Sequence, residues 1–272
     1  MESYVPKLVR TSRKYCFVLK EPAKASMLMG MSRSKRHRIM ASLANLTRYL
    51  GCYDYWRGIV KNSGLKWDKR GGVEAFLSIV NTDLREVEEW LRTAVERLPR
   101  KYAVTLTFLA LTGVRPSEAC KSASLITKLL ERGQLEKKYF SRELSMLEHF
   151  KFPKLFLRRS KNCYISFVSQ DLLDLILETD KIYERDITYA AMVWGIQKIA
   201  HLPVRMLQLR KLYATTLREK GITKEIIDLL QGRIGQSIFL RHYYKPYLRK
   251  VKAKVLKAIE PMTTDLIEKT LN

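Results

Sequence analysis

Cysteine is scarce in this chain, and its placement excludes the common metal-binding motifs. The 272 residues include four cysteines, which lie far apart and form no Cys-x-x-Cys pair. No apolar run approaches the roughly 18 residues that a membrane-spanning helix needs. No apolar segment follows the first charged residues, so no secretory signal is visible. We therefore expect a reduced, cytoplasmic protein without membrane spans.

Acidic residues are also few. The chain has 27 Asp and Glu against 51 Lys and Arg, which gives a formal net charge of +24 at pH 7. Because 46% of the residues are apolar, the chain is not a disordered polycation. Such an excess of positive charge predicts a polyanionic partner. Nucleic acid is the first candidate, and an anionic membrane surface is the alternative.

Conventional enzyme signatures are missing as well. The sequence contains no GxxxxGK[ST], GxSxG or HExxH motif, and its four histidines are far apart. It shows no obvious acidic cluster for a two-metal nuclease. If the chain breaks a phosphodiester bond, we expect chemistry without a metal or other cofactor. That chemistry needs a protein nucleophile, rigid cationic donors around the phosphate and a proton donor.

Helical periodicity runs through most of the sequence. Apolar residues spaced three and four apart predict helices at 39–50, 54–62, 74–80, 87–98, 102–112, 116–133, 170–178, 187–200, 204–220 and 223–231. Residues 1–25 lack this periodicity and are expected to form a mobile basic arm. Residues 154–168 predict two short strands around a turn at 160–162. A basic amphipathic helix after Pro246 is expected to close the core.

The fold class that follows is mainly α with a small β-hairpin or sheet. Asp83 and Glu86 have the spacing of a helix capping box, so the boundary between two domains is placed just before them. The domains are then residues 1–82, which contain the basic arm, and residues 83–272.

Two arginines are placed where an ordinary surface residue is not expected. Arg115 lies between a buried helix and the next helix, and Glu118 is within helical reach of it, although the two could form an ordinary surface ion pair. Arg210 shares one helical face with apolar residues, so it must be paired, face a ligand, or extend from the edge of the core.

The remaining candidate site residues are each weak evidence when taken alone. Lys161 lies at the tip of the predicted hairpin, and Arg233 follows a helix end, where it could simply complement the helix dipole. Tyr243 and Tyr244 lie among cations that favour a nearby phosphate.

Together these segments resemble the tyrosine recombinase (phage integrase) family, most closely its archaeal virus and plasmid branch. The similar segments are LALTGVRPSEA (109–119), RRSKNCYISF (158–167), LQLRKLYATTL (207–217) and LLQGRIGQSIFLRHYYKP (229–246). Residues 42–67 resemble the helical core-binding domain of the archaeal members. The resemblance implies a DNA clamp made of this domain and a recombinase catalytic domain. We expect DNA-binding cations in the first domain at Arg33, Lys35, Arg36, Arg38 and Lys66.

The resemblance also implies a mechanism. Tyr243, or alternatively Tyr244, would attack duplex DNA and form a 3′-phosphotyrosyl link, with Lys161 as general acid. Arg115, Arg210 and Arg233 would hold the phosphate, and Glu118 would accompany the first of them. Family members act as tetramers on two attachment sites and integrate or excise a mobile element. The segment after Pro246 is a candidate for docking on a neighbouring subunit.

Two positions depart from the family pattern. The second box normally has His or Lys where Leu207 stands, so Arg205, Lys211 or Lys161 would have to cover that role. The last box normally has His or Trp where Arg233 stands, and a guanidinium can still donate to a phosphate oxygen. Three other functions stay open: a type IB topoisomerase, a non-catalytic DNA-binding protein and a peripheral membrane protein.

Overall fold

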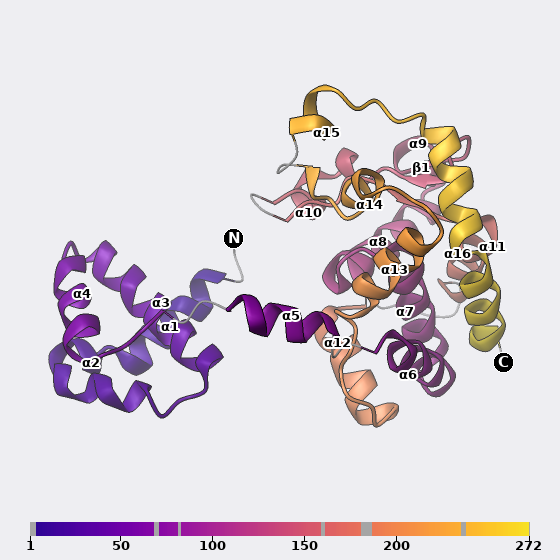
Figure 1. Cartoon of the computed structure of the whole chain (residues 1–272). Helices are drawn as coiled ribbons and strands as arrows, with labels where there is room; N and C mark the ends of the chain where they lie inside the picture. Colours follow the sequence, from indigo (N-terminus) through magenta and orange to yellow (C-terminus); the bar gives the residue numbers. More distant parts are fainter. Residues whose placement is uncertain are drawn as a thin grey trace. The chain divides into compact units, whose positions relative to one another are not determined.

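The computed structural model describes residues 4–67, 71–80, 83–158, 161–180, 187–234 and 238–271. It is mainly helical with one small three-stranded antiparallel sheet, which confirms the expected fold class. The chain divides into two compact units, Met1–Thr82 and Asp83–Asn272, each with its own hydrophobic core (Figure 1). Within the described residues, no helix is both long and apolar enough to cross a membrane.

The N-terminal unit is built of helices alone in its described part. They are α1 (Tyr4–Tyr15), α2 (Phe17–Lys20), the 3-10 helix η1 (Pro22–Leu28), α3 (Arg33–Tyr49), α4 (Tyr53–Asn62) and α5 (Gly72–Val80). Helix α3 is the centre of this unit, and Ile39, Met40 and Leu43 on it are fully buried. Trp56 of α4 packs into the same core.

The expected mobile arm at the N-terminus is wrong. Residues 4–28 form α1, α2 and η1, and α1 packs along α3. The contact is close because both helices present a small residue: the hydroxyl of Ser12 donates to the carbonyl of Ser42 at 3.1 Å. A stripe that includes a buried serine is not recognisable as apolar, which explains why the periodicity was not visible in the sequence.

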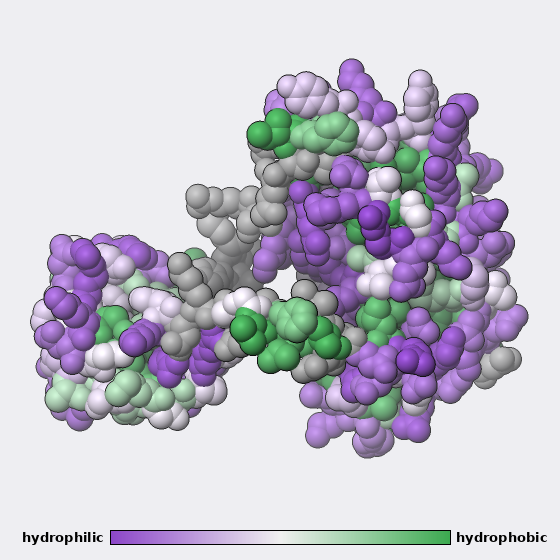
Figure 2. Space-filling view, in the orientation of Figure 1, coloured by the Kyte–Doolittle hydropathy of each residue, from purple (hydrophilic) through white to green (hydrophobic). Residues whose placement is uncertain are grey.

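Helix α5 leaves an apolar stripe uncovered in this structure. Val73, Phe76, Leu77 and Val80 follow one another at helical spacing and are all exposed. Figure 2 shows this stripe as a green group over α5.

The C-terminal unit contains the remaining helices and the sheet. Its helices are α6 (Leu84–Arg97), α7 (Arg100–Thr112), α8 (Pro116–Leu130), α9 (Leu135–Lys138), the 3-10 helix η2 (His149–Lys151), α10 (Pro153–Phe156), α11 (Gln170–Asp180), α12 (Tyr189–Trp194), the π-helical turn η3 (Gly195–Ile199), α13 (Leu209–Glu219), α14 (Lys224–Leu230), α15 (Ile238–His242) and α16 (Leu248–Leu271). The strands are β1 (Phe140–Ser141), β2 (Met146–Leu147) and β3 (Ser166–Phe167).

Helix α7 is the centre of the C-terminal unit (Figure 1). Every residue from 103 to 112 is buried, because α6, α8, α11, α13 and α16 all pack against it. This agrees with the apolar character of residues 102–112 on all sides of the helix. Asp83 caps α6 by accepting a hydrogen bond from the Arg85 amide at 2.8 Å, but Glu86 pairs with Arg205 instead of completing a capping box.

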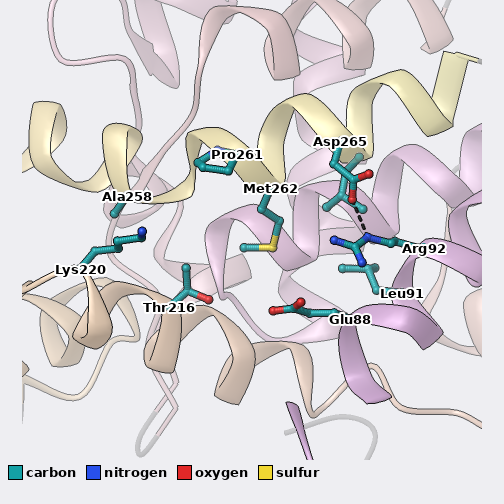
Figure 3. Close-up of a pocket in the computed structure, with 10 residues that line it drawn as sticks. Glu88, Leu91, Arg92, Thr216, Lys220, Ala258, Pro261, Met262 and Asp265 are labelled. Atoms are coloured by element: carbon teal, nitrogen blue, oxygen red, sulfur yellow. Dashed lines mark hydrogen bonds and ion pairs between the residues drawn. The ribbon is translucent and has the colours of Figure 1, made fainter. Parts of the chain in front are cut away.

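Helix α16 closes the core as expected. Val255, Ile259 and Leu266 are buried against the rest of the unit, so its apolar face is already covered within the chain. At its C-terminal half, Asp265 accepts a hydrogen bond from Arg92 of α6 at 2.7 Å. Figure 3 shows this ion pair beside a cavity of about 230 Å³ between α6, α13 and α16.

The expected hairpin at 154–168 is wrong. Pro153 begins a short helix, α10, that buries Phe156, so the described residues 154–158 of the first predicted strand form no strand. The second part contributes only β3, which pairs with β2, and β2 pairs with β1. Residue 160 of the expected turn lies outside the described residues. Alternation in a short segment predicts a strand but does not say which segment it pairs with, and here the partner comes from upstream.

We predict that Gly113→Ala destabilises the protein more than Gly133→Ala. Both glycines have a φ near +60°, which costs an alanine about 1–2 kcal/mol. At Gly113 a Cβ atom would also lie 2.2 Å from the ring of Tyr213, whereas at Gly133 it meets nothing within 4 Å. The clash should add about 1–3 kcal/mol, measured as the difference in free energy of unfolding in urea. Equal losses in the two variants would contradict this packing.

Candidate functional site

The first part of the site is the corner between α7 and α8. Gly113 ends α7 in a left-handed conformation, and Pro116 begins α8 directly after Arg115. Glu118 is fully buried and accepts bonds from the Arg115 backbone at 2.9 Å and from its Nη1 at 2.8 Å. Arg158 also donates to Glu118, at 3.4 Å. The pair is therefore a partly buried contact that fixes the Arg115 side chain, and not an ordinary surface ion pair.

Arg210, in the first turn of α13, is the most enclosed cation of the site. Its Nη1 donates to the carbonyl of Gly113 at 2.9 Å and its Nη2 to the carbonyl of Gln231 at 3.0 Å. The side chain of Gln231 donates back to the Arg210 carbonyl at 2.8 Å. Two reciprocal contacts thus join the start of α13 to the end of α14.

Arg115 and Arg233 both lie within electrostatic reach of Arg210. Burial is the main cause that lowers the pKa of Arg210, to about 10, and the positive charges of Arg115 and Arg233 lower it further. Glu118 opposes this shift. Like charges gathered in a partly buried place are stabilised by an anion, so the cluster is suited to bind a phosphate group.

The turn that carries Arg233 fits closely against the segment that carries Lys161. Gly232 has a φ of +70°, and a Cβ atom there would lie 1.8 Å from the carbonyl oxygen of Asn162. The same carbonyl accepts a bond from Arg115 at 3.1 Å. Lys161 precedes Asn162 and is exposed. Segments far apart in the sequence therefore meet at one place, and they carry Arg115, Lys161, Arg210 and Arg233.

Tyr243 and Tyr244 have different environments. Tyr243 follows α15 with 75% of its side chain exposed. Tyr244 is half-buried, stacks on Phe239 at 5.5 Å between ring centroids, and packs against the core. Within the described part of the chain, no hydrogen bond or ion pair joins either tyrosine to the three arginines.

Leu207 is the position in the second box at which this chain departs from the family pattern. Leu207 is 67% exposed and lies just before α13. Arg205, one of its suggested substitutes, donates to Glu86 at 3.1 Å and is engaged there. Lys211, another of them, is exposed on α13.

The expected DNA-binding cations of the N-terminal unit lie mainly at the start of α3. The first turns of α3 hold Arg33, Lys35, Arg36 and Arg38, of which Lys35 and Arg38 are exposed, and Lys66 is exposed after α4. The first turn of α3 has no acidic residue. The N-terminal end of a helix favours anions, so these cations extend a surface that is already suited to phosphate.

Several residues of the site were not anticipated from the sequence. Asn162, Gln231 and Asp228 hold the arginines through carbonyl or side-chain oxygens, and Arg158 shares Glu118 with Arg115. A signal existed only for Gly232, since a glycine directly after a helix indicates a left-handed turn.

No group of three or more acidic, histidine or cysteine side chains that could hold a metal ion occurs within the described residues.

In the same unit, a buried polar network joins the sheet to α8. His149 lies between Tyr139, 2.7 Å from its Nδ1, and Ser166, 2.8 Å from its Nε2, and Tyr139 also donates to Ser122. Burial lowers the pKa of His149 to about 3. The imidazole is therefore neutral in the folded protein at neutral pH.

This histidine predicts a pH dependence of stability. Its pKa is near 6.5 in the unfolded chain, so below pH 6.5 the unfolded state binds a proton that the folded state does not take up until about pH 3. Stability attributable to His149 should fall by about 2 kcal/mol between pH 6.5 and 5. His149→Gln should lack this component in urea unfolding, while the exposed-histidine variant His201→Asn should retain it. A wild-type pH profile in His149→Gln would contradict the prediction.

Guanidinium groups gathered on a helical scaffold are suited to bind a phosphate group. Comparison with known families shows to which family the chain belongs. The sequence model of the archaeal phage integrase family matches residues 79–255, more than half of the chain. The chain therefore belongs to the archaeal phage integrase family. The matched range contains Arg115, Lys161, Arg210, Arg233 and Tyr243. No curated protein and no solved structure matches the chain.

The family supports the general role of an integrase, a protein that acts on DNA in recombination. It agrees with the resemblance noted in the sequence and confirms it at the level of the family.

Proposed function

We propose that the chain is a metal-independent tyrosine-type site-specific recombinase, which cuts and rejoins duplex DNA to integrate or excise a mobile element. The observation that carries this proposal is the meeting of Arg115, Arg210 and Arg233, each held by protein acceptors, beside the segment with Lys161. Guanidinium groups held in this way bind the non-bridging oxygens of a phosphate and stabilise its charge in the transition state.

The strand-cleavage step uses a nucleophile and a proton donor from the chain. The hydroxyl oxygen of Tyr243 attacks the scissile phosphorus and forms a 3′-phosphotyrosyl bond, while the bond to the 5′-oxygen breaks. Lys161 gives its proton to that leaving oxygen as general acid. The reverse attack by a 5′-hydroxyl rejoins the strand, so the step needs no oxidant and no nucleotide.

The environments of the two tyrosines favour Tyr243 as the nucleophile. Tyr244 contributes to the core and stacks on Phe239, which fixes its ring. Tyr243 is exposed next to it, and its ring has only an edge contact with the exposed His242, so it is the side chain better able to reach a bound DNA strand.

The two units divide the work of binding. Residues 1–82 act as a core-binding domain that contacts the DNA backbone through the cations at the start of α3, and residues 83–272 form the catalytic domain. A charge of +24 supplies the electrostatic part of the affinity. We expect a tetramer on two attachment sites, as the family resemblance implies.

The second candidate function is a DNA-binding protein of the same fold that lacks catalysis. Leu207 is the observation that favours it, because a leucine neither transfers a proton nor donates a hydrogen bond. A type IB topoisomerase would use the same tyrosine chemistry on a single duplex.

Covalent trapping tests the proposal. The protein is incubated in EDTA with a nicked suicide duplex carrying its attachment site, and denaturing gels detect protein linked to DNA. We predict an adduct with the wild type and with Tyr244→Phe, and none with Tyr243→Phe. Arg210→Ala should lose the adduct while keeping non-specific DNA binding, because it removes charge stabilisation at the scissile phosphate, whereas non-specific binding depends on the many other cations of the chain.

The outcomes separate the candidates. No adduct together with tight, salt-sensitive binding of the same DNA would favour the non-catalytic protein. An adduct lost in Tyr244→Phe and retained in Tyr243→Phe would overturn the choice of nucleophile. Relaxation of supercoiled DNA that has no attachment site would point to the topoisomerase.

A further inference from the structure

Asp228 is an acidic residue in a place where acid is unexpected. It lies on α14, one turn before Arg233, and only 12% of its side chain is exposed. Its carboxylate Oδ2 is 2.6 Å from Lys224 Nζ, and its Oδ1 is 3.6 Å from Arg233 Nη1. Its backbone carbonyl accepts a bond from the Arg233 amide at 2.7 Å. A carboxylate this close to a phosphate-binding cluster would repel a phosphate, so its presence there needs an explanation.

The contacts of Arg115 and Arg210 indicate what Asp228 does for Arg233. Arg115 is held by Glu118 and by the Asn162 carbonyl, each through Nη1, and Arg210 is held by two backbone carbonyls. In both residues some of the five guanidinium N–H groups are used for fixation and others are left for a ligand. At Arg233 the corresponding acceptor is the carboxylate of Asp228, which forms an ion pair with Nη1 at 3.6 Å.

An arginine at position 233 needs an acceptor that fixes its side chain more than a histidine or tryptophan would. Its long side chain loses more conformational freedom when it is fixed than an imidazole or indole does, and its charge is repelled by Arg210. A carboxylate beside it offsets the repulsion and restricts the guanidinium to one side of the turn.

We propose that Asp228 is the positioning residue for Arg233, and that it enables an arginine to act where the family pattern has His or Trp. The inference rests on the proposed recombinase function. Asp228 does not touch the DNA; it acts only through Arg233. Lys224 contacts the other oxygen of the carboxylate, and 77% of its side chain is exposed, so we expect it to contribute little to the position of Arg233.

The test measures the single-turnover rate of adduct formation on the suicide duplex at saturating DNA. Asp228→Asn should lower this rate about tenfold or more, because a misplaced guanidinium loses much of its effect in the transition state. Asp228→Glu keeps the charge and should lie between the wild type and Asp228→Asn. DNA affinity should change less than threefold in both variants. Lys224→Met should keep the wild-type rate.

A double-mutant cycle distinguishes positioning from a general structural role. In an Arg233→Ala background, Asp228→Asn and Asp228→Glu should change the rate less than twofold, because the residue through which they act is gone. A matched control is Asp265→Asn, which removes the carboxylate from another ion pair of the same unit, with Arg92 (Figure 3). That variant should form the adduct at the wild-type rate.

The contradicting results are equally specific. Wild-type rates in both Asp228 variants, or the same loss with and without Arg233, would overturn the inference and leave the recombinase function intact. A rate lost in Lys224→Met would assign the effect to Lys224. Absence of any adduct with the wild-type protein would remove the proposed function itself. Asp228→Glu serves as the decisive variant if Asp228→Asn does not fold.

Discussion

The guanidinium of Arg210 joins the parts of the C-terminal unit that have to meet for the site to exist. It bonds the carbonyl that ends α7 and the carbonyl that ends α14, while its own helix, α13, begins beside them. Both contacts are made to chain reversals with a left-handed glycine, Gly113 and Gly232. A side chain at either glycine would push apart the segments that carry the arginines.

The electrostatics of the site follow from this enclosure. Three arginines close together repel one another, and burial makes the repulsion stronger. Carbonyl oxygens and two nearly buried carboxylates, Glu118 and Asp228, offset it in the protein alone. A scissile phosphate would offset it further. The same residues that hold the arginines would therefore also orient them for the phosphate of the proposed reaction, which is the basis of electrostatic preorganisation.

The sequence predicted those parts of the fold that depend on local pattern. The all-round apolar segment at α7, the glycine that ends it and the proline that begins α8 were readable, and so was the charged residue at Arg210 in an apolar face. The sheet was mispredicted because strand pairing is not local: β3 pairs with residues upstream of α10. The N-terminal helices were missed because serines occupy the contact between α1 and α3.

The residues that hold the arginines in place could not be predicted either, because their contacts are also not local in the sequence. Gln231 and Asn162 act through backbone carbonyls, which every residue has, so their identity carries no signal. Asp228 is one of many acids four residues from a lysine on a helix, and such a pair ordinarily indicates a solvated face. Its importance appears only when Gly232 turns the chain and brings Arg233 back toward α14.

The most direct test of the role of Arg210 removes the negative charge of the scissile phosphate. In a suicide duplex whose scissile group is a methylphosphonate, one non-bridging oxygen is a methyl group and the linkage is neutral. If Arg210 acts by balancing negative charge, Arg210→Ala should fail to form an adduct on the natural phosphodiester and should form one on the methylphosphonate. An equal defect on both substrates, in a variant that melts cooperatively, would show that Arg210 only holds the segments of the site together and does not balance the charge of the phosphate.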